Sequence, residues 1–205
     1  MGVYVRNLVR TFLLVATIVQ FGCAPAAPKV DALVYETAKP IKPFKFTDQH
    51  GEVIDNKALT GKWTLLFLGY TSCPDICPMT LSKLAQVKQQ LTEHPQLTVW
   101  FVSVDPQRDT SEKLKLYTDY FDPSFTAVTA PHSELFPFVR NLGLVYAISD
   151  SKAENYTVDH SASVALVDPK GNVRAIFKPE FKAGSVPLID ADKMVAELNQ
   201  IIAYY

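Results

Sequence analysis

Residues 63–77 read WTLLFLGYTSCPDIC, and residues 78–91 continue directly as PMTLSKLAQVKQQL. The first six residues form an almost continuous apolar run, which is typical of a strand buried inside a sheet. Leu81, Leu84 and Leu91 recur at helical spacing, and Pro95 lies just beyond the end of that pattern. The stretch therefore predicts a buried strand, a loop that holds two cysteines, and an amphipathic helix.

The remainder of the chain from residue 44 alternates between strand and helix patterns. Strands are expected at 44–46, 52–54, 97–104, 125–129 and 145–148, and a hairpin at 163–177 around the turn 168–172. Helices are expected at 109–121, at 133–142 and from 190 onward. This alternation predicts a three-layer α/β/α domain with a mixed sheet. The order of elements indicates a thioredoxin-like topology with an inserted αβ unit, and the long polar connection 149–159 is expected to be a flap.

Composition excludes several classes of protein. The chain has 205 residues, of which 48% are hydrophobic and 20% charged, and its net charge is −1. These values are those of an ordinary globular domain, not of a disordered, collagen-like or multi-span membrane chain. A near-neutral charge argues against a nucleic-acid partner. Three cysteines are too few for a disulfide scaffold, so each sulfur needs its own explanation.

The first 43 residues are predicted to be an export signal followed by a tether. Arg6 and Arg10 precede the apolar stretch 11–22, which is short for a membrane-spanning helix and typical of an export signal. Gly22-Cys23-Ala24 resembles a bacterial lipoprotein cleavage site, which would make Cys23 a lipid attachment point; an uncleaved anchor is the alternative. Residues 23–43 are rich in Ala and Pro, as in an extended tether. The predicted division is therefore 1–22 signal or anchor, 23–43 tether and 44–205 folded domain, exported and held on the periplasmic side of a bacterial membrane.

Cys73 and Cys77 each precede a proline, a position that disfavours helical backbone. Pro78 suits the first position of the helix, so Cys77 is expected at or near the N-cap and neither cysteine inside the helix. There the positive end of the helix dipole should lower the pKa of the Cys77 thiol and favour its thiolate.

Three interpretations of this pair compete. An inert disulfide would close only a tiny loop and stabilise little. A redox dithiol usually has two residues between its cysteines, whereas here there are three. A metal site needs a third ligand, and His160, between the expected flap and the hairpin, is the candidate, with a hydrogen-bonded structural histidine as its alternative. Two thiolates and an imidazole suit copper or zinc, and three protein ligands leave a position open.

Four motifs together carry a family resemblance. TSCPDICP at 71–78, SVDPQRDT at 103–110, DHS at 159–161 and LVDPKG at 166–171 resemble the SCO/SenC family of copper-binding cytochrome c oxidase assembly factors. The resemblance runs from about residue 44 to the carboxyl terminus. It implies a membrane-tethered, thioredoxin-like metallochaperone that is not an enzyme in the turnover sense.

The resemblance also implies a site and partners. Cu(I) or Cu(II) would be bound by Cys73, Cys77 and His160, to help build the dinuclear copper centre of oxidase subunit II. Other periplasmic copper chaperones or thiol reductants are further expected partners. Asp159 and Asp105 are candidates for groups that support the site, with a carboxylate of a turn as the alternative for Asp159 and turn formation with Pro106 as the alternative for Asp105.

Two other functions remain open. A thiol:disulfide oxidoreductase that reduces the copper-ligand cysteines of subunit II would need Cys73 and Cys77 but not His160. A peroxiredoxin-like peroxidase is suggested by the expected fold alone, and a fold does not determine a function.

Overall fold

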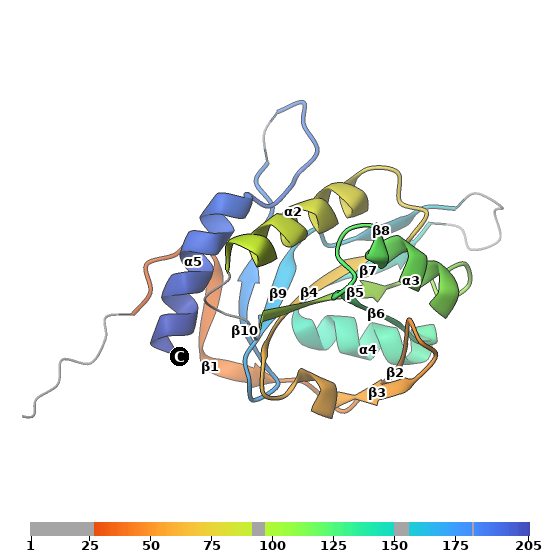
Figure 1. The fold of residues 1–205 in the computed structure, drawn as a ribbon, viewed down its shortest axis with the longest axis horizontal. Helices are drawn as coiled ribbons and strands as arrows, with labels where there is room; N and C mark the ends of the chain where they lie inside the picture. Colours follow the sequence, from red (N-terminus) through yellow and green to blue (C-terminus); the bar gives the residue numbers. More distant parts are fainter. Residues whose placement is uncertain (1–26, 92–96, 150–155, 182) are drawn as a thin grey trace, which may run out of the picture.

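The structure, a computed structural model, describes residues 27–91, 97–149, 156–181 and 183–205 (Figure 1). The expected export signal at 1–22 and Cys23 lie outside the described residues, as does the 150–155 part of the expected flap. In the part of the chain that is described, no helix is both long and apolar enough to cross a membrane.

An eight-stranded mixed sheet forms the centre of the domain. Its strands, in the order in which they lie side by side, are β1 (Leu33–Pro40), β10 (Asn172–Phe177), β9 (Val164–Val167), β4 (Trp63–Gly69), β5 (Leu97–Ser103), β6 (Thr126–Thr129), β2 (Lys45–Asp48) and β3 (Val53–Asp55). The central strands β4, β5 and β6 are parallel, and every residue of β4 is buried. The apolar run at residues 63–68 thus lies in a central strand of the sheet, as its composition predicts.

Helices cover both faces of this sheet. They are α2 (Ile76–Gln90), α3 (Ser111–Asp119), α4 (His132–Leu142) and α5 (Ala191–Tyr204), with a short 3-10 helix, η1 (Asn56–Leu59), after β3. Figure 1 shows α2, α3 and α5 on one side and α4 behind the sheet. The rings of Phe101 and Tyr117 of α3 meet on the first side, whereas the neighbouring Trp100 meets Phe44, which packs on Phe138 of α4. The expected three-layer α/β/α arrangement is confirmed.

Two strands lie apart from the main sheet. β7 (Tyr146–Ile148) and β8 (Val158–His160) pair with each other in an antiparallel two-stranded sheet, with Tyr146 opposite His160. β7 corresponds to the strand expected at 145–148, and β8 includes the last two residues of the expected flap at 149–159. Among the described residues, neither strand pairs with the eight-stranded sheet.

The beginning of the folded domain differs from the expected boundary at residue 44. Residues 33–40, assigned to the tether, form β1, which pairs antiparallel with β10 at the edge of the sheet. The register shifts between Val34 and Lys39, and this irregularity hides the two-residue alternation by which a strand is recognised. Within this irregular part of β1, Arg174 of β10 donates hydrogen bonds to the backbone carbonyls of Tyr35 and Glu36.

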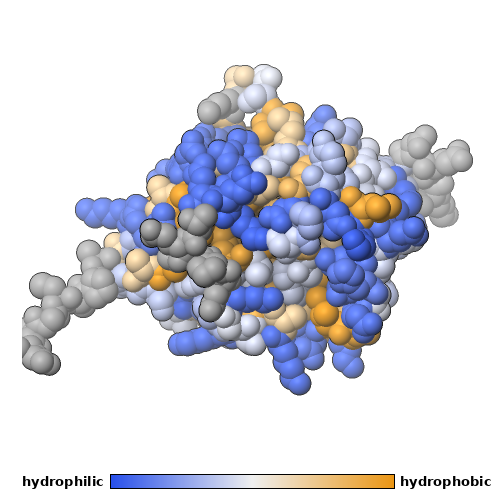
Figure 2. All heavy atoms as spheres, in the orientation of Figure 1, coloured by the Kyte–Doolittle hydropathy of each residue, from blue (hydrophilic) through white to orange (hydrophobic). Residues whose placement is uncertain are grey.

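The outer surface is mostly hydrophilic in the view of Figure 2, and its apolar residues lie in small, separate groups. Exposed apolar side chains include Leu116 on α3, Tyr120 at the C-cap of that helix, and Phe181. Small scattered apolar groups are normal for a soluble domain.

Candidate metal centre

The two cysteines lie where β4 passes into α2. The strand ends at Gly69, residues 70–75 form the loop, and the helix begins at Ile76 with Asp75 as its N-cap. The expected start at Pro78 is therefore wrong, and Cys77 lies inside the first helical turn. Proline is tolerated there because the first N–H groups of a helix have no acceptor within it. Cys77 is fully buried, whereas Cys73, in the loop, is partly exposed.

Gly69 makes the burial of Cys77 possible. A β-carbon at this position would lie 2.4 Å from Cε2 of Phe101 and 3.0 Å from Sγ of Cys77. The first separation is too short for a real side chain and the second is tighter than most real contacts, so glycine lets the ring and the sulfur approach the backbone of β4 this closely. The residue was not singled out from the sequence, although a glycine between a buried strand and a cysteine loop is a usable signal.

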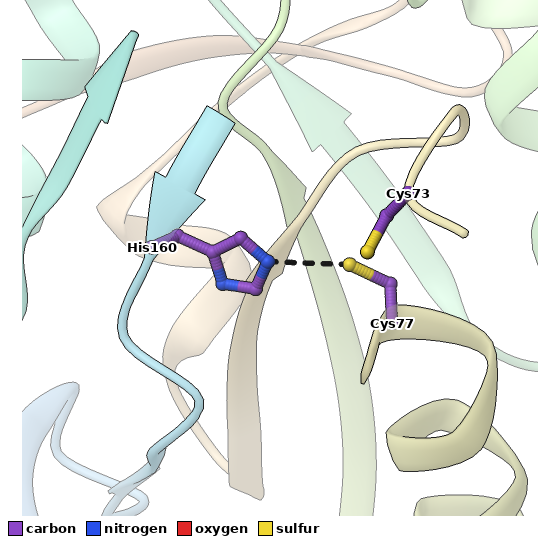
Figure 3. A group of neighbouring side chains, drawn as sticks. All are labelled: Cys73, Cys77 and His160. Carbon is purple, nitrogen blue, oxygen red and sulfur yellow. Dashed lines mark hydrogen bonds between the residues drawn. The ribbon is translucent and has the colours of Figure 1, made fainter. Parts of the chain in front are cut away.

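His160, the last residue of β8, brings its ring to the two sulfurs (Figure 3). Its Nε2 lies 3.3 Å from Cys77 Sγ, and the three donor atoms of Cys73, Cys77 and His160 all lie within 4.8 Å of one another. On the other side of the ring, Nδ1 lies 3.1 Å from the backbone carbonyl oxygen of Ser161. A proton on Nδ1 would donate to that carbonyl and leave the lone pair of Nε2 directed at the sulfurs. Sequence elements 83 residues apart thus converge on one point.

The two thiols have opposite electrostatic environments. Hydrogen bonds from Cys77, the largest cause, and from nearby backbone N–H groups lower the pKa of Cys73, despite partial burial. Burial is the largest cause that raises the pKa of Cys77, and the neighbouring Cys73 raises it further. The expectation that the pKa of the Cys77 thiol would be lowered is wrong: its complete burial outweighs its place near the helix N-terminus, and the lowered pKa belongs to Cys73.

The two carboxylates expected to support the site do not reach its donor atoms. Asp159 is exposed, and because neighbouring side chains of a strand point to opposite faces, it faces away from His160. A backbone carbonyl, that of Ser161, takes the orienting role proposed for Asp159. Asp105 is fully buried, but its partners are Arg108 and the hydroxyl of Tyr156.

Asp109 is the carboxylate that holds the cysteine loop. It accepts hydrogen bonds from the backbone N–H of Thr71 at 3.0 Å and from its hydroxyl at 2.6 Å, and a third from Ser103 at 2.6 Å. Burial raises the pKa of this carboxyl. Asp109 was interpreted from the sequence as the start of a helix, but Thr110 is the N-cap of α3. Its role could not be inferred because its partners lie in other segments.

The donor set fits a thiophilic metal ion. Two sulfurs and one imidazole nitrogen suit Cu(I) and also Zn²⁺. Structural zinc sites almost always have four protein ligands, whereas only these three His, Cys or carboxylate donors cluster at this point among the described residues. The geometry therefore favours an ion that is held with a position open to a partner.

Comparisons of the sequence with known proteins agree with this site. A family described as SCO1/SenC matches residues 34–195. A putative copper-binding protein of Stutzerimonas stutzeri is 32% identical over 156 residues, which cover 75% of this chain and 76% of that protein. The human mitochondrial protein SCO1 homolog is 33% identical over 148 residues, which cover 70% of this chain and 49% of that protein.

Solved structures show the same fold. Arabidopsis thaliana ScoI with copper bound superposes with a TM-score of 0.69 at 30% identity, over 80% of this chain and 98% of that one. Bradyrhizobium japonicum ScoI with copper bound gives a TM-score of 0.65 at 31% identity, over 79% of this chain and 99% of that one. The expected thioredoxin-like fold is confirmed, and so is the resemblance stated from the motifs: the chain belongs to the SCO1/SenC family.

Proposed function

We propose that this protein is a copper metallochaperone whose Cys73, Cys77 and His160 hold the ion. One observation carries the proposal: two sulfurs and one imidazole nitrogen, from separate elements, lie within 4.8 Å of one another. Soft donors of this kind select Cu(I), and relatives of the chain are named as copper-binding or were solved with copper bound. The ion is cargo in this proposal, delivered to the dinuclear copper centre of cytochrome c oxidase subunit II.

The chain's own groups suit both holding and release. Cys77 and the ring of His160 are anchored by burial and by the Ser161 carbonyl, so they are fixed in advance. Cys73 is partly exposed and its lowered pKa supplies a thiolate at neutral pH. An accessible thiolate is the donor that a ligand of the partner protein can most easily replace.

The test uses the full chain purified in detergent, with Cys73→Ser, Cys77→Ser and His160→Ala compared with His50→Ala, an exposed histidine of a turn. Binding of Cu(I) is measured by competition with a chromophoric chelator, and Cu(II) by electron paramagnetic resonance. We expect one copper per wild-type and His50→Ala chain, and weakened binding with altered spectra for the other three. Unchanged stoichiometry and spectra in His160→Ala would remove it as a ligand.

A second function, thiol:disulfide exchange with the copper-ligand cysteines of subunit II, is favoured by the difference between the two thiols. The Cys73 thiolate would attack a disulfide of the partner and release one partner thiolate. Cys77 would then pass its proton to that released thiolate and attack the Cys73 sulfur of the mixed disulfide, breaking its bond to the partner and releasing the second partner thiolate. The partner gains two electrons and this chain is left with a Cys73–Cys77 disulfide. Oxidase activity in cells separates the two functions: rescue by His160→Ala but by neither cysteine variant would favour exchange.

The location remains a proposal from the sequence. We infer export to the periplasmic side of a bacterial membrane and attachment through lipid on Cys23, although Gln20 stands where such sites usually carry leucine. Mass spectrometry of the mature amino terminus distinguishes the alternatives. A lipidated Cys23 supports this anchor, whereas a chain that begins at residue 1 supports an uncleaved one.

A further inference from the structure

One loop touches both halves of the metal centre. It follows β5 and comprises residues 104–110, called the bridging loop below. On the cysteine side, Asp109 accepts two hydrogen bonds from Thr71. On the histidine side, Nη1 of Arg108 donates to the backbone carbonyl of Tyr156 at 3.0 Å. The two contacts come from adjacent residues of the same loop.

Arg108 is packed into this position from several directions. Its Nε pairs with the fully buried carboxylate of Asp105, which also accepts the hydroxyl proton of Tyr156. The guanidinium carbon lies 3.7 Å from the ring centroid of Tyr156 and 5.5 Å from that of Tyr70. The Tyr70 ring in turn meets the His160 ring edge-on, with centroids 6.2 Å apart. A continuous chain of contacts therefore joins the guanidinium to the imidazole.

This chain of contacts matters because β8, which carries His160, does not pair with the main sheet; the sheet reaches the imidazole only through the ring of Phe67 of β4, whose centroid lies 5.9 Å from that of His160 among the described contacts. β7 and β8 form their own sheet, so side chains must fix the unit's position. Tyr146 anchors β7, with its hydroxyl 2.8 Å from His132 Nδ1 and its ring stacked on Phe136. Tyr156 is held by Arg108 and Asp105 two residues before β8 begins and four residues before His160. Four extended residues span at most about 14 Å, so displacement at Tyr156 is passed to the imidazole with little slack.

We infer that Arg108 is a positioning residue, which sets the separation between the His160 imidazole and the two sulfurs by clamping Tyr156 to the bridging loop. The inference rests on the proposed copper site. Its action depends on the planar fork of the guanidinium, which reaches the Asp105 carboxylate and the Tyr156 carbonyl together and stacks on the Tyr156 ring. A lysine keeps the charge opposite Asp105 but has neither the fork nor the flat face.

The test compares Arg108→Lys with Arg174→Lys in the full chain in detergent. Arg174 is a matched control because it pairs with the buried Asp168 at 3.0 Å and lies 3.9 Å from the ring centroid of Tyr205. It belongs to β10, and among the described residues its hydrogen bonds, its ion pair and its ring contact go to Tyr35, Glu36, Asp168 and Tyr205, none of which lies in β7 or β8. Both variants therefore remove an arginine that is held between a carboxylate and a tyrosine ring.

Three measurements are made on each variant. In the metal-free protein, hydrogen–deuterium exchange is followed at residues 156–161. Cu(I) affinity is measured by chelator competition, and the nitrogen coupling of His160 by electron paramagnetic resonance of bound Cu(II). We expect Arg108→Lys to speed exchange in this segment, to weaken Cu(I) binding roughly 10-fold, the lower end of the effect of residues that orient metal ligands, and to reduce the nitrogen coupling. Arg174→Lys should change none of the three.

Each other outcome counts against the inference. Wild-type exchange and affinity in Arg108→Lys would overturn it, and so would equal effects in the two variants, which would show a structural role alone. If Arg108→Lys fails to fold, Tyr156→Phe, which removes only the hydroxyl bond to Asp105, must give a smaller change in the same direction. If the wild type binds no copper, the proposed function fails, while the exchange measurement still decides whether Arg108 holds β8.

Discussion

The metal centre joins two parts of the molecule that are held in different ways. Cys77 belongs to the main core: it is fully buried in the first turn of α2, against Gly69 of the central strand β4. His160 belongs to the small β7–β8 sheet, which side chains attach to the body of the domain. Cys77 is therefore held by the packing of the main core, whereas His160 is held largely by side-chain contacts outside the hydrogen-bond ladder of the main sheet.

Among the substitutions considered, Gly69→Ala should most strongly disturb the packing of Cys77 in the core. The added methyl group would lie 2.4 Å from the ring of Phe101, so the buried ring and the Cys77 sulfur must both move. We expect unfolding in urea to show a loss of about 3 kcal/mol, near the top of the usual range for overpacking, together with weaker copper binding. Gly51→Ala is the control, because it strains a turn with positive φ but meets nothing within 4 Å. Equal copper affinity in wild type and Gly69→Ala would contradict this account.

Asp109→Asn should have the next largest effect, on the link between the core and the cysteine loop. An amide keeps one acceptor but turns a donor toward Thr71 or Ser103, which should cost about 2 kcal/mol. The pH dependence supplies a second check. Because burial raises the pKa of Asp109 in the folded state, its ionised form costs stability above that pKa, and this cost is relieved as the pH falls through it.

The wild type should therefore gain stability relative to Asp109→Asn as the pH is lowered toward the unfolded carboxyl pKa, about 4. Urea unfolding of both proteins at several pH values measures the difference. A stability difference that does not vary with pH would show that the carboxyl titrates as it does in the unfolded chain.

The two cysteines should also differ in how fast their thiols are alkylated. Cys73 is partly exposed and its pKa is lowered, whereas Cys77 is fully buried. In the metal-free protein at neutral pH we expect iodoacetamide to modify Cys73 at least about 10-fold faster, equivalent to about 1.4 kcal/mol. The Cys73 rate should change little between about pH 6 and 8, since its thiolate is already formed. Peptide mass spectrometry over time assigns each rate, and faster labelling of Cys77 would reverse the assignment.

The smallest effect is expected at the second anchor of the β7–β8 sheet. Tyr146→Phe removes the hydroxyl bond to His132 but keeps the ring stacked on Phe136, which should cost about 1 kcal/mol. Amide exchange in β7 and β8 should quicken by about five-fold, while exchange in β4 stays unchanged. Tyr120→Phe, at an 84% exposed position, is the control. Quickened exchange in β4 would show that the two parts are not held independently.

Most of the fold could be predicted because its core follows simple periodicity. The buried runs at 63–68 and 97–104 are central strands, and the leucines of α2 face the core. β1 could not be recognised, because its bulge breaks the alternation and its alanine and proline belong to a stretch with the composition of a tether. The start of α2 was placed two residues late because the rule against helical backbone before proline is weak in a first turn.

Only part of the candidate site could be predicted from the sequence. Cys73 and Cys77 stand out in their loop, but His160 became the preferred third ligand only through the family motifs. Its position depends on Arg108 and Tyr156, 48 residues apart in the chain. A contact between residues so far apart cannot be predicted from local sequence patterns, and neither can the contact between Asp109 and Thr71. The pKa order of the two thiols was missed for a related reason, because complete burial of Cys77 depends on Gly69 and Phe101.

The bulge in β1 affects how readily another chain could add a strand to the edge of the sheet. An exposed sheet edge is a template on which another chain can add a strand and start aggregation. Here one edge strand is interrupted between Val34 and Lys39 and finishes in Lys39 and Pro40, while the other, β3, is three residues long. Bulges, lysine, proline and short length are all features that discourage such pairing. The sheet is thus protected against self-association at both of its ends, even at the high local concentration that a membrane anchor would create.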